Sequence, residues 1–284
     1  FIDILTNGNT SLLFVALILI PFNYGIEAKK WQILLSPLQH VSWINAFKSI
    51  LAGITISIFT PNRTGEVIGK VVYLDLQEKM KAALLNFSGS MAQMICTSLA
   101  GLWGTIIYLN FYSFKEIDLP ATQVIYAIAS ICTLLAFLIY FNQQKFFTWI
   151  SNKKWAKKIH ISFTNQQQFK SSLQVKVLVL SIIRYIVFSS QLVLLLNFCG
   201  IHATIFQLFL LCTVFFLVMW FLPSFALTEL GVRGSVAVML FQNVSENISG
   251  ALLAVVLLWI INVALPALIG CIYVFNLTGK KDFE

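Results

Sequence analysis

Seven apolar segments dominate this chain, and most of them are long enough to cross a lipid bilayer as a helix. Of its 284 residues, 58% are apolar and only 11% are charged, against roughly a quarter charged in an ordinary soluble domain. A soluble fold needs more polar residues to cover its surface. We therefore expect an all-α polytopic membrane protein. The apolar segments are residues 10–24, 43–60, 83–109, 121–141, 175–199, 204–222 and 250–275.

The basic residues predict how these segments are oriented. The formal net charge is +8, and no acidic residue occurs between Asp118 and Glu229. Because cytoplasmic loops of membrane proteins carry an excess of Lys and Arg, we expect residues 142–174 to lie in the cytoplasm, at the inner face of the cell membrane. They form either a solvated basic loop or interfacial helices on anionic lipid. The lysines of this stretch and its border are Lys145, Lys153, Lys154, Lys157, Lys158, Lys170 and Lys176.

Two segments interrupted by Pro and Gly predict an inverted repeat. Residues 43–74 have basic residues near both ends and break at Pro61 to Gly65, so we expect a re-entrant hairpin entering from the cytoplasm. Residues 204–241 have both ends on the opposite side and break near Pro223 to Gly234, so we expect a second hairpin. Matching broken helices that enter from opposite faces are typical of secondary transporters. We accordingly predict one membrane repeat in residues 1–141 and a second in residues 175–284.

Four charged residues lie at or beside the predicted breaks: Arg63, Glu66, Glu229 and Arg233. An ionisable side chain at membrane depth costs about 2.5–3.5 kcal/mol on insertion, so its presence is a hypothesis of function. Spacings of three and four residues predict an Arg63–Glu66 pair and a Glu229–Arg233 pair. Two interpretations are open. The pairs pin the breaks as internal salt bridges, or the arginines receive an anionic lipid headgroup, which a guanidinium can bind through two parallel donors.

Further polar residues join the candidate substrate-binding set. Asn62 lies within the first break, and Arg184 lies inside the apolar segment 175–199. Arg184 either faces the site or extends its side chain to the cytoplasmic surface. Glu27, Lys29 and Lys30, beside Trp31, are interpreted first as an interfacial anchor, with a binding site as the alternative.

The sequence contains no pattern typical of a metal site, a cofactor site or nucleic-acid binding. The five cysteines form no C-x-x-C pair, and the three histidines are isolated from one another. No P-loop or H-E-x-x-H motif occurs, and the longest polar stretch is too short for a soluble catalytic core. We expect no metal and no cofactor. An intramembrane enzyme stays open as an alternative, with Glu66 or Glu229 as general base.

Three stretches carry a family resemblance. They are Ala-Lys-Lys-Trp at residues 28–31, Thr-Pro-Asn-Arg-Thr-Gly-Glu-Val at residues 60–67, and Leu-Pro at residues 222–223 followed by Leu-Gly-Val-Arg-Gly at residues 230–234. Together they resemble the flippase-like transmembrane region of lysylphosphatidylglycerol synthases, which is also the membrane region of multiple peptide resistance factors. The first break fits the family's P-x-R-x-G-E string fully. The second has Gly234 where the family commonly has Glu, so Glu229 is expected to supply that carboxylate.

The resemblance implies translocation of a lipid with an anionic headgroup: a phospholipid, an aminoacyl-phospholipid or a polyprenyl phosphate. It also implies a leading membrane helix that we do not find before Thr10 and expect to be missing with the N-terminus. A chain ending at Glu284 is expected to lack the soluble transferase domain and so to move or bind a lipid made by a partner enzyme, alone or as a homo-oligomer. The alternatives are an intramembrane lipid-modifying transferase and a non-transporting accessory subunit.

Overall fold

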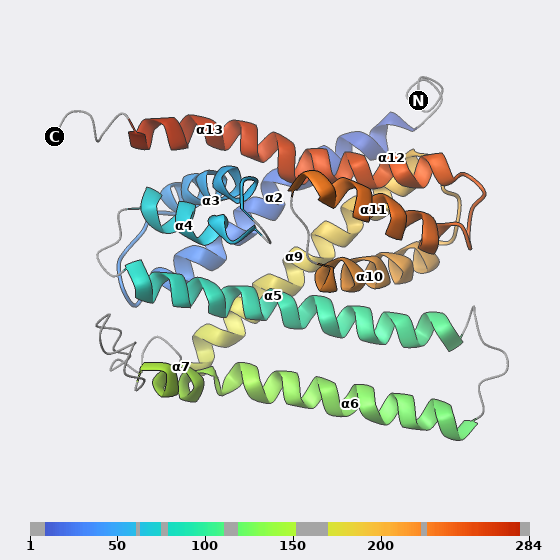
Figure 1. Ribbon diagram of the computed structural model, residues 1–284, viewed down its shortest axis with the longest axis horizontal. Helices are drawn as coiled ribbons and strands as arrows, with labels where there is room; N and C mark the ends of the chain where they lie inside the picture. Colours follow the sequence, from blue (N-terminus) through green and yellow to red (C-terminus); the bar gives the residue numbers. More distant parts are fainter. Residues whose placement is uncertain are drawn as a thin grey trace.

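The computed structural model describes residues 9–60, 63–74, 79–110, 119–151, 170–222 and 226–278, and every regular element within those ranges is a helix (Figure 1). The prediction of an all-α fold is confirmed. The elements are α2 (Thr10–Leu35), α3 (Trp43–Ser57), α4 (Gly65–Tyr73), α5 (Lys79–Tyr108), α6 (Leu119–Phe141), α7 (Gln143–Ser151), α9 (Ser171–Phe198), α10 (Ile205–Phe221), α11 (Ala226–Phe241), α12 (Ile248–Trp259), the π-helical η4 (Ile260–Ala264) and α13 (Leu265–Thr278).

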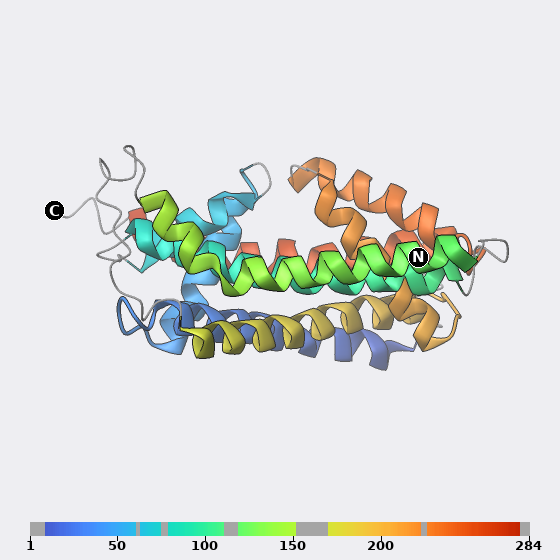
Figure 2. The same ribbon diagram turned by 90° about the horizontal axis from the view of Figure 1, so that it is seen from below.

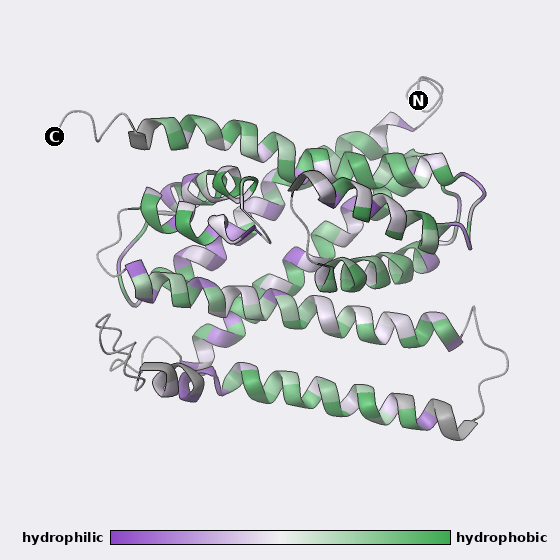
Figure 3. Ribbon diagram, viewed as in Figure 1, coloured by the Kyte–Doolittle hydropathy of each residue, from purple (hydrophilic) through white to green (hydrophobic). Residues whose placement is uncertain are grey.

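Four helices are long and apolar enough to cross a membrane. They are α2, α5, α9 and the continuous run Ile248–Phe275 formed by α12, η4 and most of α13. Shorter apolar helices cover Tyr126–Phe141 and Ile205–Phe221, and apolar residues follow α6, α10, α12 and α13 along their length (Figure 3). Many large apolar side chains on these helices are exposed, Leu134 and Phe275 among them. Lipid contact explains that exposure, so this is a multi-pass membrane protein.

Side chains at the helix ends fix where several helices begin. The first backbone N–H groups of a helix lack partners within it, and Ser, Thr and Asn side chains accept from them. Ser42 accepts from the Asn45 N–H before α3, and Asn247 accepts from the Gly250 N–H before α12. Before α10, Thr204 and Gln207 bond reciprocally in a capping box. The caps at Ser42 and Thr204 separate a short helix from the long helix before it, and the cap at Asn247 separates α11 from the long run that follows.

The two short helix pairs, α3–α4 and α10–α11, occupy opposite ends of the molecule, with their breaks facing the centre (Figure 2). Helix α2 packs against α9, α3 packs against α13, and α10 packs against α5. The short pair α3–α4 therefore packs against α13 of the C-terminal half, and the short pair α10–α11 packs against α5 of the N-terminal half. Exchanging α2 with α9, α3 with α10, and α5 with α12–α13 preserves these contacts. That is the pattern a two-fold internal repeat produces; the inverted orientation of the two halves and the re-entry of the pairs into a bilayer stay predictions.

Two hydrophobic cores support this arrangement. The first is built mainly from the N-terminal half and contains Trp31, Leu34 and Ile50, while the second is built mainly from α9 to α12 and contains Leu196 and Phe215. Each core also takes residues from the opposite half: Val177 and Ala267 in the first, and Ala16 in the second. The halves are consequently interlocked rather than merely adjacent.

One end of the molecule gathers helix ends that the charge pattern predicts to share a membrane face. The end of α2, the start of α5, the end of α6 and the start of α9 lie together, with α7 beside them (Figure 1). Within the predicted basic stretch, residues 143–151 form α7, and residues 152–169 lie outside the described residues. Both break sequences are partly outside them too, at Pro61, Asn62 and residues 223–225.

Close backbone contact between α3 and α4 gives a stability prediction. A Cβ placed on Gly69 would lie 2.6 Å from the Cα of Gly53, whereas a Cβ on Gly231 in α11 meets nothing within 4 Å. We expect Gly69→Ala to destabilise the protein by about 1–3 kcal/mol through overpacking. The matched change Gly231→Ala is expected to be neutral or to stabilise by up to about 1 kcal/mol, because Ala restricts the unfolded chain. Thermal unfolding in detergent measures both, and equal melting temperatures would contradict the close packing.

Candidate functional site

The two helix breaks meet through an ion pair. Arg63 Nη2 donates to both carboxylate oxygens of Glu229, at 3.1 and 3.0 Å, across 166 residues of sequence. Glu229 also accepts from Arg233 Nε at 2.9 Å, one helical turn further along α11. We call these three residues the break junction. Glu229 and Arg233 are largely shielded, with 7% and 12% of their side chains exposed, but Arg63 is 38% exposed.

The structure confirms one predicted pair and corrects the other. Glu229 and Arg233 pair within α11 as their spacing predicts. The predicted Arg63–Glu66 pair is wrong, because Glu66 pairs instead with Lys70 at 2.6 Å, one turn along α4, and Arg63 pairs across the molecule. The cause is the backbone: Arg63 precedes α4 in a non-helical conformation and so does not share a helical face with Glu66.

Arg63 has a strained backbone. Its φ is 56°, in the left-handed region, and it is the one non-glycine residue with positive φ among the described residues. That conformation costs roughly 1–2 kcal/mol for an L-residue. The turn is held by the Arg63 N–H bonding to the Thr60 carbonyl and by the Gly65 N–H bonding to Thr60 Oγ1 at 2.8 Å. Strain of this kind clusters at functional sites, and here it directs the guanidinium to the other break.

A second set of charges, buried except for Glu66 (33% exposed) and Arg184 (26% exposed), lies between α2, α4 and α9. Glu27 Oε2 lies 2.7 Å from Lys30 Nζ and 3.1 Å from Arg184 Nη1, and Glu27 Oε1 lies 3.3 Å from Lys70 Nζ. Lys70 also pairs with Glu66. We call Glu27, Lys30, Glu66, Lys70 and Arg184 the buried ion cluster. Its lysines are almost completely enclosed, at 2% exposure for Lys30 and 1% for Lys70.

Amides and a phenol complete the hydrogen bonding around these charges. Lys70 Nζ donates to Asn86 Oδ1 at 3.2 Å, and Arg184 Nε donates to Asn23 Oδ1 at 3.0 Å. Asn23 in turn donates to Asn262 Oδ1 at 2.9 Å. The Tyr24 hydroxyl donates to the Asn262 backbone carbonyl. Buried charges are tolerated when their remaining donors and acceptors are satisfied in this way.

A proline explains why the Asn262 carbonyl is free to accept from Tyr24. In an α-helix this carbonyl would accept from the N–H four residues later, which is position 266, and Pro266 has no N–H. The chain there adopts the π-helical turn η4, in which the Leu265 N–H bonds to the Ile260 carbonyl. Turns of this type inside α-helices are frequent at functional sites.

The buried ion cluster corrects the interpretation of Glu27 and Lys30 as an interfacial anchor. Helix α2 continues to Leu35, so both residues lie inside a packed helix and are buried. Lys70, which charge counting assigns to the cytoplasmic side, is buried as well. Arg184 lies against Glu27 and is 26% exposed, as part of the cluster. The sequence does contain a signal for this cluster: Glu27 and Lys30 are three residues apart, and Glu66 and Lys70 are four apart, so each pair can meet on one face of a helix.

Comparison with known proteins adds the family. A family model described as "Lysylphosphatidylglycerol synthase TM region" matches residues 1–270. The chain belongs to this family. Membership confirms the resemblance carried by the break motifs and relates the protein to lipid translocation or lipid modification. Comparison with curated proteins and with solved structures gave no match.

In this lysylphosphatidylglycerol synthase TM-region protein, both charged groups carry surplus positive charge. The break junction has two guanidiniums for one carboxylate, and the buried ion cluster has three cations for two carboxylates. Uncompensated positive charge in a low-dielectric interior favours an anion nearby. Among the described residues, no group of three or more His, Cys, Asp or Glu side chains is placed to hold a metal ion.

Lys70 gives the second prediction. Removing one partner of a buried ion pair typically costs about 3–5 kcal/mol, because the other partner stays buried and unpaired. Lys70→Met leaves both Glu27 and Glu66 without this cation, so we expect a large fall in melting temperature. Lys29→Met is the control, since Lys29 is exposed and bonds only to Gln32 among the described residues. Equal melting temperatures for the two variants would show that the buried ion cluster contributes little to stability.

Proposed function

We propose that this protein translocates a lipid by receiving its anionic headgroup at the break junction. One observation carries the proposal: Arg63 and Arg233 share the single carboxylate of Glu229, and Arg63 is the exposed member. A phosphate is a suitable second acceptor, because guanidinium binds carboxylate and phosphate through the same pair of parallel donors.

The exposure difference assigns different roles to the two arginines. Arg233 is shielded and lies one turn from Glu229, so it holds the carboxylate in place. Arg63 is partly exposed and reaches Glu229 from the other half of the chain. We propose that a headgroup phosphate replaces Glu229 as the partner of Arg63, while Arg233 keeps the carboxylate neutralised. The exchange would loosen the contact between the two breaks.

The arrangement of the breaks supports passage between leaflets. The short helix pairs come from opposite ends of the molecule and meet at the break junction (Figure 2). A headgroup held there would be reachable from either end as the pairs move relative to one another, which is the general logic of alternating access. We further propose that the end carrying α7 and the start of α9 faces the cytoplasm of the cell, in line with the positive-inside rule.

The carboxylates argue against the lipid-modifying alternative. A general base needs a carboxylate free to take a proton within hydrogen-bond reach of the substrate. Glu66 is paired with Lys70, and Glu229 is paired with two arginines. Both are engaged with cations, which stabilise the ionised carboxylate and so make it a weaker proton acceptor. Translocation is therefore the better supported function.

The test is transport of a fluorescent phosphatidylglycerol in reconstituted vesicles. We expect Arg63→Asn to lower the transport rate at least tenfold, because loss of a charged hydrogen bond of about 1.5–3 kcal/mol corresponds to that factor or more. Asn is chosen because it tolerates the left-handed backbone at this position. Lys145→Asn, which removes an exposed charge on α7, is the matched control and should transport normally.

Two further readouts separate the alternatives. Arg63→Lys keeps the charge but not the paired donors, so we expect a rate between wild type and Arg63→Asn. If Arg63→Asn transports at the wild-type rate with a lowered melting temperature, the junction is a structural salt bridge and the proposal fails. Recovery of chemically altered lipid from the vesicles would favour a transferase instead.

A further inference from the structure

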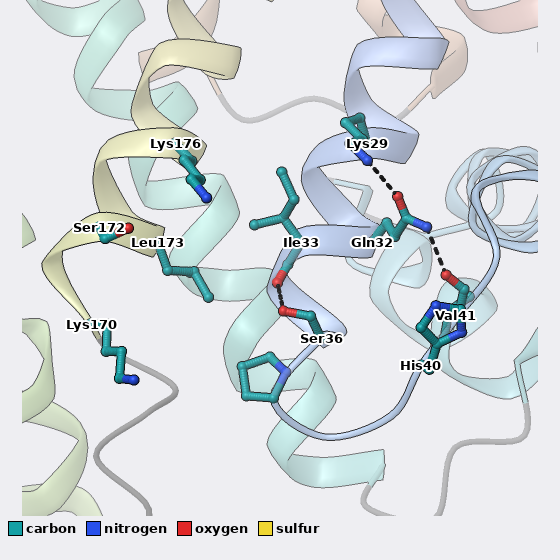
Figure 4. A pocket seen from close by; sticks show the side chains of 11 residues that line it. Lys29, Gln32, Ile33, Ser36, His40, Val41, Lys170, Ser172, Leu173 and Lys176 are labelled. Atoms are coloured by element: carbon teal, nitrogen blue, oxygen red, sulfur yellow. Dashed lines mark hydrogen bonds between the residues drawn. The ribbon is translucent and has the colours of Figure 1, made fainter.

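A separate basic cavity opens at the end of the molecule where α2 ends and α9 begins. It has a volume of about 710 Å³ and is lined by the last turns of α2, the turn that follows it and the first turns of α9 (Figure 4). That volume is within the range of small-molecule and headgroup sites. None of its lining residues belongs to the break junction or to the buried ion cluster. It is therefore a distinct place for a ligand.

The charge of the cavity has one sign. Lys29, Lys170 and Lys176 line it, and no Asp or Glu does. Lys29 donates to Gln32 at 2.9 Å, so its position is partly fixed. Among the described residues, no carboxylate lies within ion-pair distance of Lys170 or Lys176, and both lysines are exposed. Three ammonium groups around a cavity without a counter-charge make a site for an anion.

The start of α9 strengthens this positive potential. Ser172 and Leu173, from the first turn of this 28-residue helix, line the cavity. Lys170 precedes the helix without forming a side-chain cap, and its carbonyl accepts from the Leu173 N–H at 2.9 Å. The N–H groups of Ser171 and Ser172 have no intrahelical partner and so accompany the lysines. A helix N-terminus and ammonium groups together suit a phosphate.

Besides the lysines, the lining has polar side chains, Gln32, Ser36 and His40 among them, and a few apolar ones that suggest what accompanies the phosphate. Ile33 and Leu173 face the cavity from α2 and α9 (Figure 4). Both helices end here, at the same end of the molecule as α7, where a bilayer would have its headgroup layer. Basic pockets between helices at that depth are suited to anionic lipids. A phosphodiester with an apolar glycerol ester beside it matches both kinds of lining.

We propose that this cavity binds the phosphate of an anionic phospholipid headgroup, as a site separate from the break junction. The three lysines neutralise the phosphate, the α9 N-terminus donates to it, and Ile33 and Leu173 contact the glycerol and the upper acyl chain. A free phosphate ester carries the same phosphate group as a lipid headgroup. The experiment below distinguishes these two sources of phosphate.

The test is titration of the purified full chain with phosphatidylglycerol or phosphatidylcholine, read by native mass spectrometry. We expect wild type to prefer phosphatidylglycerol and Lys170→Gln/Lys176→Gln to lose one bound molecule with at least a tenfold fall in affinity. The control pair Lys48→Gln/Lys145→Gln makes the same charge change away from the cavity and should retain it. Ser172→Trp, which keeps every lysine and fills the cavity, should also lose that molecule.

The outcomes are separable from those at the break junction. Arg63→Asn should retain the cavity lipid, so the two proposals fail independently. Displacement of this lipid by millimolar pyrophosphate would show that free phosphate also enters; no displacement would assign the site to lipid alone. Equal retention by wild type, Lys170→Gln/Lys176→Gln and Ser172→Trp would overturn the proposal. So would an equal loss in the control pair, which would indicate a general charge effect.

Discussion

The contact between Arg63 and Glu229 is the interaction on which the centre of this structure depends. It joins two helix breaks whose contacting residues are 166 positions apart in the sequence. Arg233 keeps Glu229 ionised and oriented, and the left-handed turn at Arg63 aims the guanidinium across the gap. The two halves of the chain thus touch at their least regular points through a polar contact, while their long helices α2 and α9 pack through apolar side chains and the Glu27–Arg184 ion pair.

Buried charge in this protein is organised around carboxylates with several cations each. Glu27 contacts Lys30, Lys70 and Arg184, and Glu229 contacts two arginines. Because several cations share one carboxylate, fewer carboxylates must be desolvated. Each cluster is then left with more positive than negative charges. An isolated neutral pair would need no further ligand. These clusters favour a visiting anion.

Sequence reasoning predicted the helices well and the charge partners poorly. Residues 83–109, 121–141 and 175–199 correspond to α5, α6 and α9 with shifts of a few residues, because lipid imposes a minimum apolar length that is visible in sequence. The Glu229–Arg233 pair was found because it lies within one helix. Arg63–Glu229 and Glu27–Arg184 were not, since no local spacing reports a contact between distant segments. The extension of α2 to Leu35 was missed because charged residues interrupt its apolar pattern.

The π-helical turn at Ile260–Ala264 makes the shape of one helix depend on another. Pro266 leaves the Asn262 carbonyl without its intrahelical donor, and the Tyr24 hydroxyl of α2 supplies the missing bond. Asn262 also receives a bond from Asn23, the neighbour of Arg184. Any change in curvature of the 248–278 rod must therefore be accompanied by a shift of the amide and phenol that flank the buried charges. The helical run 248–278 is therefore coupled to the buried ion cluster through the hydrogen bonds of Tyr24 and Asn23.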